Sequence, residues 1–171
     1  MANKNWTDDD PVDSPKRRRL PPLLRRCWYS LNQAFRRRLA HTGISPDQFT
    51  ILRILLEHEP TGLTQFELAT QMSSDPNTVS SLLRRMTEVG LVLRKRVETD
   101  RRALQVRISE AGGSTYHEAR KLALDLQSAL LEKIPEARRE QFLLDLDLVA
   151  TAAAEQAKKG KTLGRATREL P

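Results

Sequence analysis

The chain has 171 residues, enough for one domain with a hydrophobic core but too few for two large independent domains. Its 29 Lys and Arg residues outnumber 22 Asp and Glu residues, and the net charge of +7 fits an anionic partner such as nucleic acid. The 39% apolar content and only 7 glycines predict a mainly α-helical protein rather than a β-sandwich or β-barrel. One cysteine cannot form an intramolecular disulfide, and we find neither a signal-peptide pattern nor a membrane-spanning segment, so we expect a cytoplasmic protein.

Both ends of the chain are expected to lie outside the folded domain. Residues 1–19 contain four Asp, two Pro and a Lys-Arg-Arg-Arg run with almost nothing to bury, which predicts a disordered charged arm. Residues 158–171 contain five basic residues and two glycines, which predicts a frayed basic tail. The folded domain is therefore expected at residues 20–157.

Two helices are predicted in the first third of the chain. Over residues 20–35 the apolar side chains recur at i, i+3, i+4 and i+7, which indicates a long amphipathic helix. Ser45 followed by Pro46 has the pattern of an N-cap with proline in the first turn, and Pro60 marks the end of this second helix.

Two further capped helices are predicted next. Thr64 and Glu67 have the spacing of a capping box, which starts a short third helix. Asp75 followed by Pro76 starts a fourth helix, which Gly90 ends. The short third helix, a tight turn and the fourth helix together have the length of a helix-turn-helix.

The fourth helix separates its apolar and polar side chains onto opposite faces. The face expected to pack inward carries Val79, Leu82, Leu83, Met86 and Val89. The opposite arc carries Asn77, Thr78, Ser80, Ser81, Arg84, Arg85 and Glu88.

A β-hairpin and two long helices are predicted to complete the domain. Residues 91–97 and the alternating residues 104–108 predict two strands around a polar tip at residues 98–102. Ser109 is expected to cap a long fifth helix that Pro135 breaks, and residues 136–157 predict a sixth helix. The fifth helix is expected to bury Tyr116, Ala119, Leu122, Ala123, Leu126, Ala129 and Leu130. The sixth is expected to bury Phe142, Leu146, Val149 and Ala153.

A helix-turn-helix followed by a basic hairpin predicts a winged DNA-binding lobe. Small polar side chains at the start of the fourth helix can approach base edges in the major groove, and arginines can reach guanines or phosphates. An arginine at the hairpin tip can enter the minor groove, and Asp100 is expected to stabilise the wing. The expected DNA contacts are Asn77, Thr78, Ser80, Ser81, Arg84, Arg85, Arg94, Arg96, Arg101 and Arg102. The alternative is an ordinary solvated helix face beside an exposed turn.

The segments 75–80, 88–92, 100–104 and 109–112, in this order of elements, resemble the MarR family of bacterial transcriptional regulators. The resemblance implies a winged helix-turn-helix fold with four helices, a two-stranded wing and two further helices, in a homodimer built from the first and last helices. It implies dimerisation through residues 20–44 and 110–157, with residues 45–109 as the DNA-binding lobe. It also implies a duplex-DNA-binding repressor with a near-palindromic site and a small-molecule or oxidant signal. Ser81 and Arg84 depart from residues common in the family, so the operator sequence does not carry over.

Other functions find less support in the sequence. Cys27 lies on the apolar stripe of the first helix and is either a small residue in the dimer seam or a redox sensor. His41 lies fourteen residues away, about 21 Å along a helix, too far to form a catalytic dyad with it. We expect no enzyme, no metal site and no cofactor. The alternatives are a helical dimeric protein-interaction module with weak or nonspecific DNA binding, and nucleic-acid compaction through the basic tails.

Overall fold

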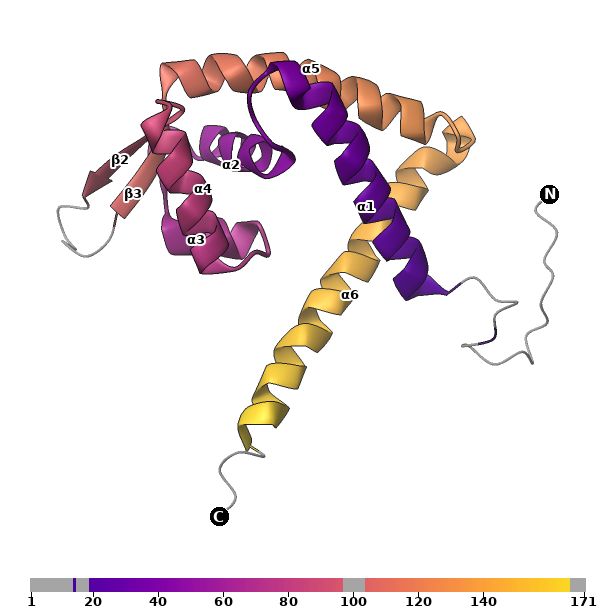
Figure 1. Ribbon diagram of the computed structural model, residues 1–171. Coiled ribbons are helices and arrows are strands. Elements are labelled where there is room, and N and C mark those ends of the chain that lie inside the picture. Colours follow the sequence, from indigo (N-terminus) through magenta and orange to yellow (C-terminus); the bar gives the residue numbers. More distant parts are fainter. Residues whose placement is uncertain (1–13, 15–18, 97–103, 167–171) are drawn as a thin grey trace. The chain divides into compact units, whose positions relative to one another are not determined.

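A computed structural model describes residues 14, 19–96 and 104–166 (Figure 1). The elements in chain order are α1 (Leu20–Arg38), the 3-10 turn η1 (Leu39–His41), α2 (Pro46–Glu57), β1 (Leu63–Thr64), α3 (Gln65–Gln71), α4 (Pro76–Glu88), β2 (Val92–Arg96), β3 (Leu104–Ile108), α5 (Glu110–Leu131), the 3-10 turn η2 (Glu136–Arg138) and α6 (Arg139–Ala166). The predicted mainly helical winged helix-turn-helix fold is confirmed. The chain divides into two compact units, the first ending at Leu126 and the second beginning at Gln127. Within the described residues no helix is both long and apolar enough to cross a membrane.

The predicted starts of α2 and α3 are confirmed as reciprocal capping boxes. The Ser45 hydroxyl accepts a hydrogen bond from the Gln48 amide (3.3 Å), while the Gln48 side chain accepts one from the Ser45 amide (2.8 Å). Thr64 and Glu67 form the same arrangement at α3. Each box satisfies two amides that helical hydrogen bonding leaves unpaired, which explains why both helices begin at these residues.

The sheet has three antiparallel strands in the order β1-β3-β2, one more than predicted. In β1, Leu63 pairs with Val106 and Thr64 with Gln105. Two residues are too few to show an alternating pattern, so β1 could not be recognised in the sequence. Gly62 precedes it with a positive φ of 74°, and a Cβ there would collide with the carbonyl oxygen of Val106.

The hydrophobic core of the first unit lies among α2, α3, α4 and the sheet, and the first part of α5 covers it. Its most completely buried side chains are Leu39, Ile51, Leu52, Leu55, Leu68, Val79, Leu83, Met86, Val92 and Val106. Phe49 of α2 stacks on Tyr116 of α5 with ring centroids 5.3 Å apart, and Phe35 of α1 meets Phe49 edge-on at 5.1 Å. These aromatic contacts connect α1, α2 and α5.

The structure corrects the predicted burial at three places. Val89 is 67% exposed, because it is the C-cap residue, at which the backbone has left the helical path. At the end of α5, Ala129 and Leu130 are exposed. In α6, Phe142, Leu146 and Ala153 are exposed as well and Val149 is half-buried.

The C-terminal helix also differs from its predicted limits. It begins at Arg139, after the 3-10 turn that follows Pro135, and it extends to Ala166. Residues 158–166 of the predicted basic tail thus belong to this helix. Each glycine in this stretch costs a helix about 1 kcal/mol relative to alanine, and the alanines and lysines around them favour the helix. Most of the predicted N-terminal arm lies outside the described residues.

A compact set of contacts fastens the hairpin to α5. The Ser109 hydroxyl donates to the carbonyl oxygen of Gly90 (2.6 Å) and accepts from the Gly112 amide (2.9 Å), which confirms its predicted capping role. The Ser109 amide donates to the carbonyl oxygen of Leu91 (3.2 Å). A Cβ at Gly112 would collide with that same Leu91 oxygen, whereas a Cβ at Gly113 would meet nothing within 4 Å. The close approach of α5 to Leu91, the residue before β2, therefore depends on glycine at position 112.

This contrast predicts opposite effects for two neighbouring substitutions. We expect Gly112→Ala to lower the free energy of unfolding by about 1–3 kcal/mol, because the backbone must shift to accommodate the methyl group. We expect Gly113→Ala to raise it by up to about 1 kcal/mol, because alanine favours an open helical position. Urea denaturation followed by circular dichroism measures both changes, and equal effects would contradict the proposed packing.

The capping box of α3 makes stability depend on pH. The Thr64 amide (2.7 Å) and the Thr64 hydroxyl (2.8 Å) both donate to the Glu67 carboxylate and hold the pKa of Glu67 below its ordinary value. Because the pKa is lower in the folded chain, the carboxylate stabilises the fold above the ordinary pKa. That contribution is lost as the pH falls through the lowered pKa.

We therefore expect Glu67→Gln to reduce the pH dependence of unfolding. Between about pH 6 and about pH 3, which span the ordinary Glu pKa of about 4.3, the wild type should lose more stability than the variant. Urea denaturation across this range measures the difference. Parallel profiles would show that Glu67 contributes no pH-dependent stability.

Candidate nucleic-acid interface

The start of α4 is held by a capped turn between α3 and α4. The Asp75 carboxylate accepts hydrogen bonds from the amides of Asn77 (2.9 Å) and Thr78 (3.2 Å). Ser73 adopts a positive φ of 49° in the turn, and the Ser74 amide donates to the carbonyl oxygen of Ala69 (3.0 Å). The first turn of α4, which carries the predicted base-reading side chains, is thus fixed relative to α3.

The two faces of α4 separate as the sequence predicts, apart from the exposed Val89 and the half-buried Ser80. Val79, Leu82, Leu83 and Met86 are buried. The exposed predicted contact residues of α4 are Asn77, Thr78, Ser81, Arg84 and Arg85. Ser80 is half-buried, which places it at the edge of the polar face rather than on it.

The two arginines of α4 are held by weak contacts within the helix. Arg84 Nη1 lies 3.6 Å from Glu88 Oε1, and both side chains are exposed. Arg85 Nε donates a long hydrogen bond of 3.4 Å to the carbonyl oxygen of Ser81. Exposed ion pairs at this spacing contribute about 0.3–0.5 kcal/mol, so an incoming phosphate or base can displace them.

The strand register sorts the basic residues of the hairpin onto two faces. Arg94 pairs with Val106, and because directly paired residues share a face, Arg94 lies on the core side with Val92. It is half-buried, and its Nε and Nη2 atoms are buried without a hydrogen-bond partner in the described structure. This position does not favour the predicted DNA contact of Arg94. Lys95, exposed on the other face, is a basic candidate that sequence reasoning missed although strand alternation could have indicated it.

An ion pair holds the outer face of β3 to the turn after α2. Arg107 Nη2 lies 2.9 Å from Glu59 Oε2. The hydrogen bond and the charge of Glu59 raise the pKa of Arg107 above its ordinary value. This pair holds the Arg107 side chain beside Glu59.

Asp100, Arg101 and Arg102 lie outside the described residues, and so does the side chain of Arg96. Their roles remain predictions.

The residues weighed for other chemistry are separated in the structure. Cys27 is exposed on α1, and His41 Nε2 lies 3.6 Å from Glu118 Oε1 of α5. His58 Nδ1 lies 2.8 Å from the carbonyl oxygen of Ile54, and its Nε2 lies 3.3 Å from Gln71 Nε2. Among residues 14, 19–96 and 104–166, no group of three His, Cys, Asp or Glu residues could hold a metal ion.

Comparisons of sequence with known proteins agree with this geometry. The model of the MarR family matches residues 44–104. The organic hydroperoxide resistance transcriptional regulator of Bacillus subtilis is 36% identical over 70 residues, which make up 41% of this chain and 46% of that protein. The chain thus spans about half the length of the curated relatives it matches.

Comparisons of structure cover more of the chain. The MepR–DNA complex of Staphylococcus aureus has a TM-score of 0.74 and 22% identity over 80% of this chain and 99% of that chain, which shows the common fold. The repressor CouR bound to a 23-mer DNA duplex has a TM-score of 0.70 and 26% identity over 77% of this chain and 92% of that chain. CouR from Rhodococcus jostii has also been solved with p-coumaroyl-CoA. The chain thus resembles the MarR family over residues 44–104, the stretch that the family's model matches.

Proposed function

We propose that this chain is a sequence-specific, duplex-DNA-binding transcriptional regulator that acts as a homodimeric repressor. The observation that carries the proposal is the one-sided burial of α4, which leaves Asn77, Thr78 and Ser81 exposed on a helix that starts at a rigid cap. Small side chains allow the helix backbone to approach base edges closely. The likeness to CouR, a repressor solved on a DNA duplex, supports the same use of the fold.

The exposed apolar side chains of α1 and α6 support a dimer. In α1 they are Leu20, Leu23, Leu24, Trp28, Tyr29 and Leu31. In α6 they are Phe142, Leu143, Leu144, Leu146 and Leu148. Each helix thus exposes several large apolar side chains, and a second copy of the chain would bury them. Residues 20–44 and 110–157 are therefore the proposed dimerisation region, and residues 45–109 the DNA-binding lobe.

The wing would add contacts outside the major groove. Arg101 and Arg102 are the proposed minor-groove or phosphate contacts, Arg96 is a further proposed contact, and Asp100 is the proposed stabilising carboxylate. Release of DNA by a small ligand or an oxidant completes the proposal. The oxidant alternative rests on Cys27, which the single chain leaves exposed on α1.

The rival interpretation is a helical dimer that binds a partner protein and has little affinity for DNA. Fluorescence anisotropy with the duplex upstream of the chain's own gene separates the two functions. The regulator should bind this duplex tightly, with affinity that falls steeply as salt rises, and random duplex should compete poorly. Binding that ignores sequence, or no binding, would overturn the regulator.

The polar arc of α4 predicts a loss of specificity rather than of general affinity. We expect Asn77→Ala and Ser81→Ala each to weaken binding of the specific duplex by about 1–3 kcal/mol, because each removes a hydrogen bond to a base edge, and to change binding of random duplex little. Thr61→Ala, a change at an exposed hydroxyl residue in the turn after α2, should leave both affinities unchanged. Equal effects of Asn77→Ala and Ser81→Ala on both duplexes would mean that α4 positions the protein without reading sequence.

A further inference from the structure

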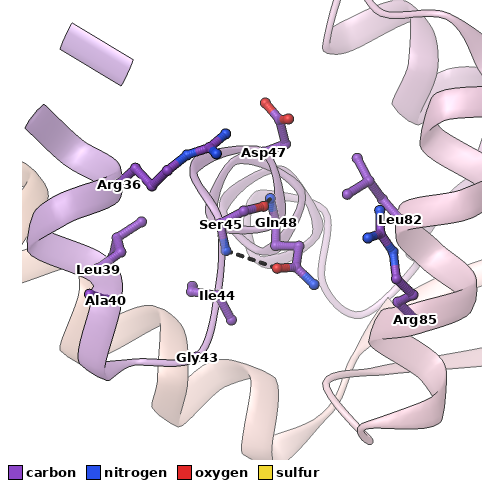
Figure 2. A pocket seen from close by; sticks show the side chains of 10 residues that line it. All are labelled: Arg36, Leu39, Ala40, Gly43, Ile44, Ser45, Asp47, Gln48, Leu82 and Arg85. Atoms are coloured by element: carbon purple, nitrogen blue, oxygen red, sulfur yellow. Dashed lines mark hydrogen bonds between the residues drawn. The ribbon is translucent and has the colours of Figure 1, made fainter. Parts of the chain in front are cut away.

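A cleft of about 600 Å³ opens beside the recognition helix (Figure 2). It lies between the C-terminal end of α1, the N-terminal end of α2 and the second half of α4, all within the first unit. Its apolar floor includes the buried side chains of Leu39, Ile44 and Leu82. Of the predicted DNA contacts, Arg85 alone lines it.

Two guanidinium groups reach the cleft from opposite sides. Arg36 comes from the last turn of α1 and Arg85 from α4, and Figure 2 shows them across the cleft from one another. Both side chains are exposed, and neither forms an ion pair within the described part of the chain. The Ser45 and Gln48 amides at the N-terminal end of α2 are already hydrogen-bonded within the capping box. The binding of an anion in the cleft therefore depends on the two arginines. Arginine pairs are suited to phosphate oxygens because their donors are planar and remain charged.

The position of Arg85 connects this cleft to the proposed reading face. Arg85 lies one turn after Ser81 on α4, and its Nε already contacts the Ser81 carbonyl oxygen. A duplex whose bases met Ser81 would therefore bring its sugar-phosphate backbone close to Arg85. If that backbone continued past Arg85 into the cleft, it would reach Arg36. The open, charged rim suits such a solvated strand better than a small molecule, which needs to be enclosed.

We propose that this cleft binds the sugar-phosphate backbone of duplex DNA, with Arg85 and Arg36 contacting phosphates from its two sides. This inference rests on the proposed function and adds Arg36, a residue of α1, to the DNA-binding surface. Among the described residues, the only carboxylate lining the cleft is that of Asp47, in the first turn of α2. Its charge opposes a phosphate in the cleft, so Asp47→Asn should tighten DNA binding.

Arg36→Ala and Arg37→Ala form a matched pair for the test. Both arginines are exposed in the last turn of α1, but only Arg36 lines the cleft. Binding is measured on specific and random duplex at several salt concentrations. Arg36→Ala should weaken binding on both and reduce the slope of log affinity against log salt by about 0.9 for each phosphate that is no longer neutralised. Arg37→Ala should leave the slope near that of the wild type, and identical behaviour of the two variants would overturn the inference.

Neutral methylphosphonate linkages, introduced one at a time, locate the phosphate. In the wild type, a neutral linkage at one position should weaken DNA binding. The same linkage should not weaken DNA binding by Arg36→Ala. Superimposable profiles for wild type and Arg36→Ala would overturn the cleft as a phosphate site while leaving the DNA-binding function intact. A wild-type chain that binds no duplex would instead overturn the proposed function, so the two failures are distinguishable.

Discussion

One face of α4 is buried against the core, and this burial determines which side chains of the helix are exposed to solvent. The buried residues are Val79, Leu82, Leu83 and Met86. These four side chains occupy one face of the helix, so rotation about its axis would expose apolar groups and bury polar ones. Burying each such side chain contributes about 1.5–3 kcal/mol, far more than any exposed contact on the opposite face. The polar arc is therefore presented to solvent by the packing behind it, and every proposed role of α4 follows from that constraint.

The hairpin and the cleft depend on the same packing. Ser109 and Gly112 bring the start of α5 against Gly90 and Leu91, directly after α4 ends, so the wing is attached to the helix it accompanies. The cleft is connected to the same core through Leu82, which is a buried core residue and also lines the cleft floor. The reading face of α4 and the cleft are thus neighbouring parts of the first unit rather than independent sites.

Local chemistry predicted the parts of the fold that are determined locally. Ser45, Thr64 and Asp75 mark helix starts because their side chains satisfy nearby amides, and the structure confirms all three. Features set by distant pairing could not be predicted in this way. β1 exists only because β3 lies beside it, and the inward face of Arg94 follows from its register with Val106.

The candidate site likewise combines features that follow from local sequence with features that depend on tertiary packing. Periodicity alone identified the exposed arc of α4, including Ser81, because helix geometry converts spacing directly into direction. Nothing in the sequence places Arg36 opposite Arg85, since they lie on helices that tertiary packing brings together. Phe142 and Leu146 of α6, which the sequence pattern predicts to be buried, are exposed in the single chain, because such a pattern does not distinguish burial within one chain from burial against a second copy.

The central claim is that two copies of this lobe read DNA through α4, and selection from a random pool of duplexes tests it most directly. Two recognition helices in successive major grooves on one face of the duplex require half-sites about 10 base pairs apart from centre to centre. The account predicts enrichment of a near-palindromic sequence with that spacing. Recovery of a pool without a common sequence, or of a single unrepeated half-site, would contradict it.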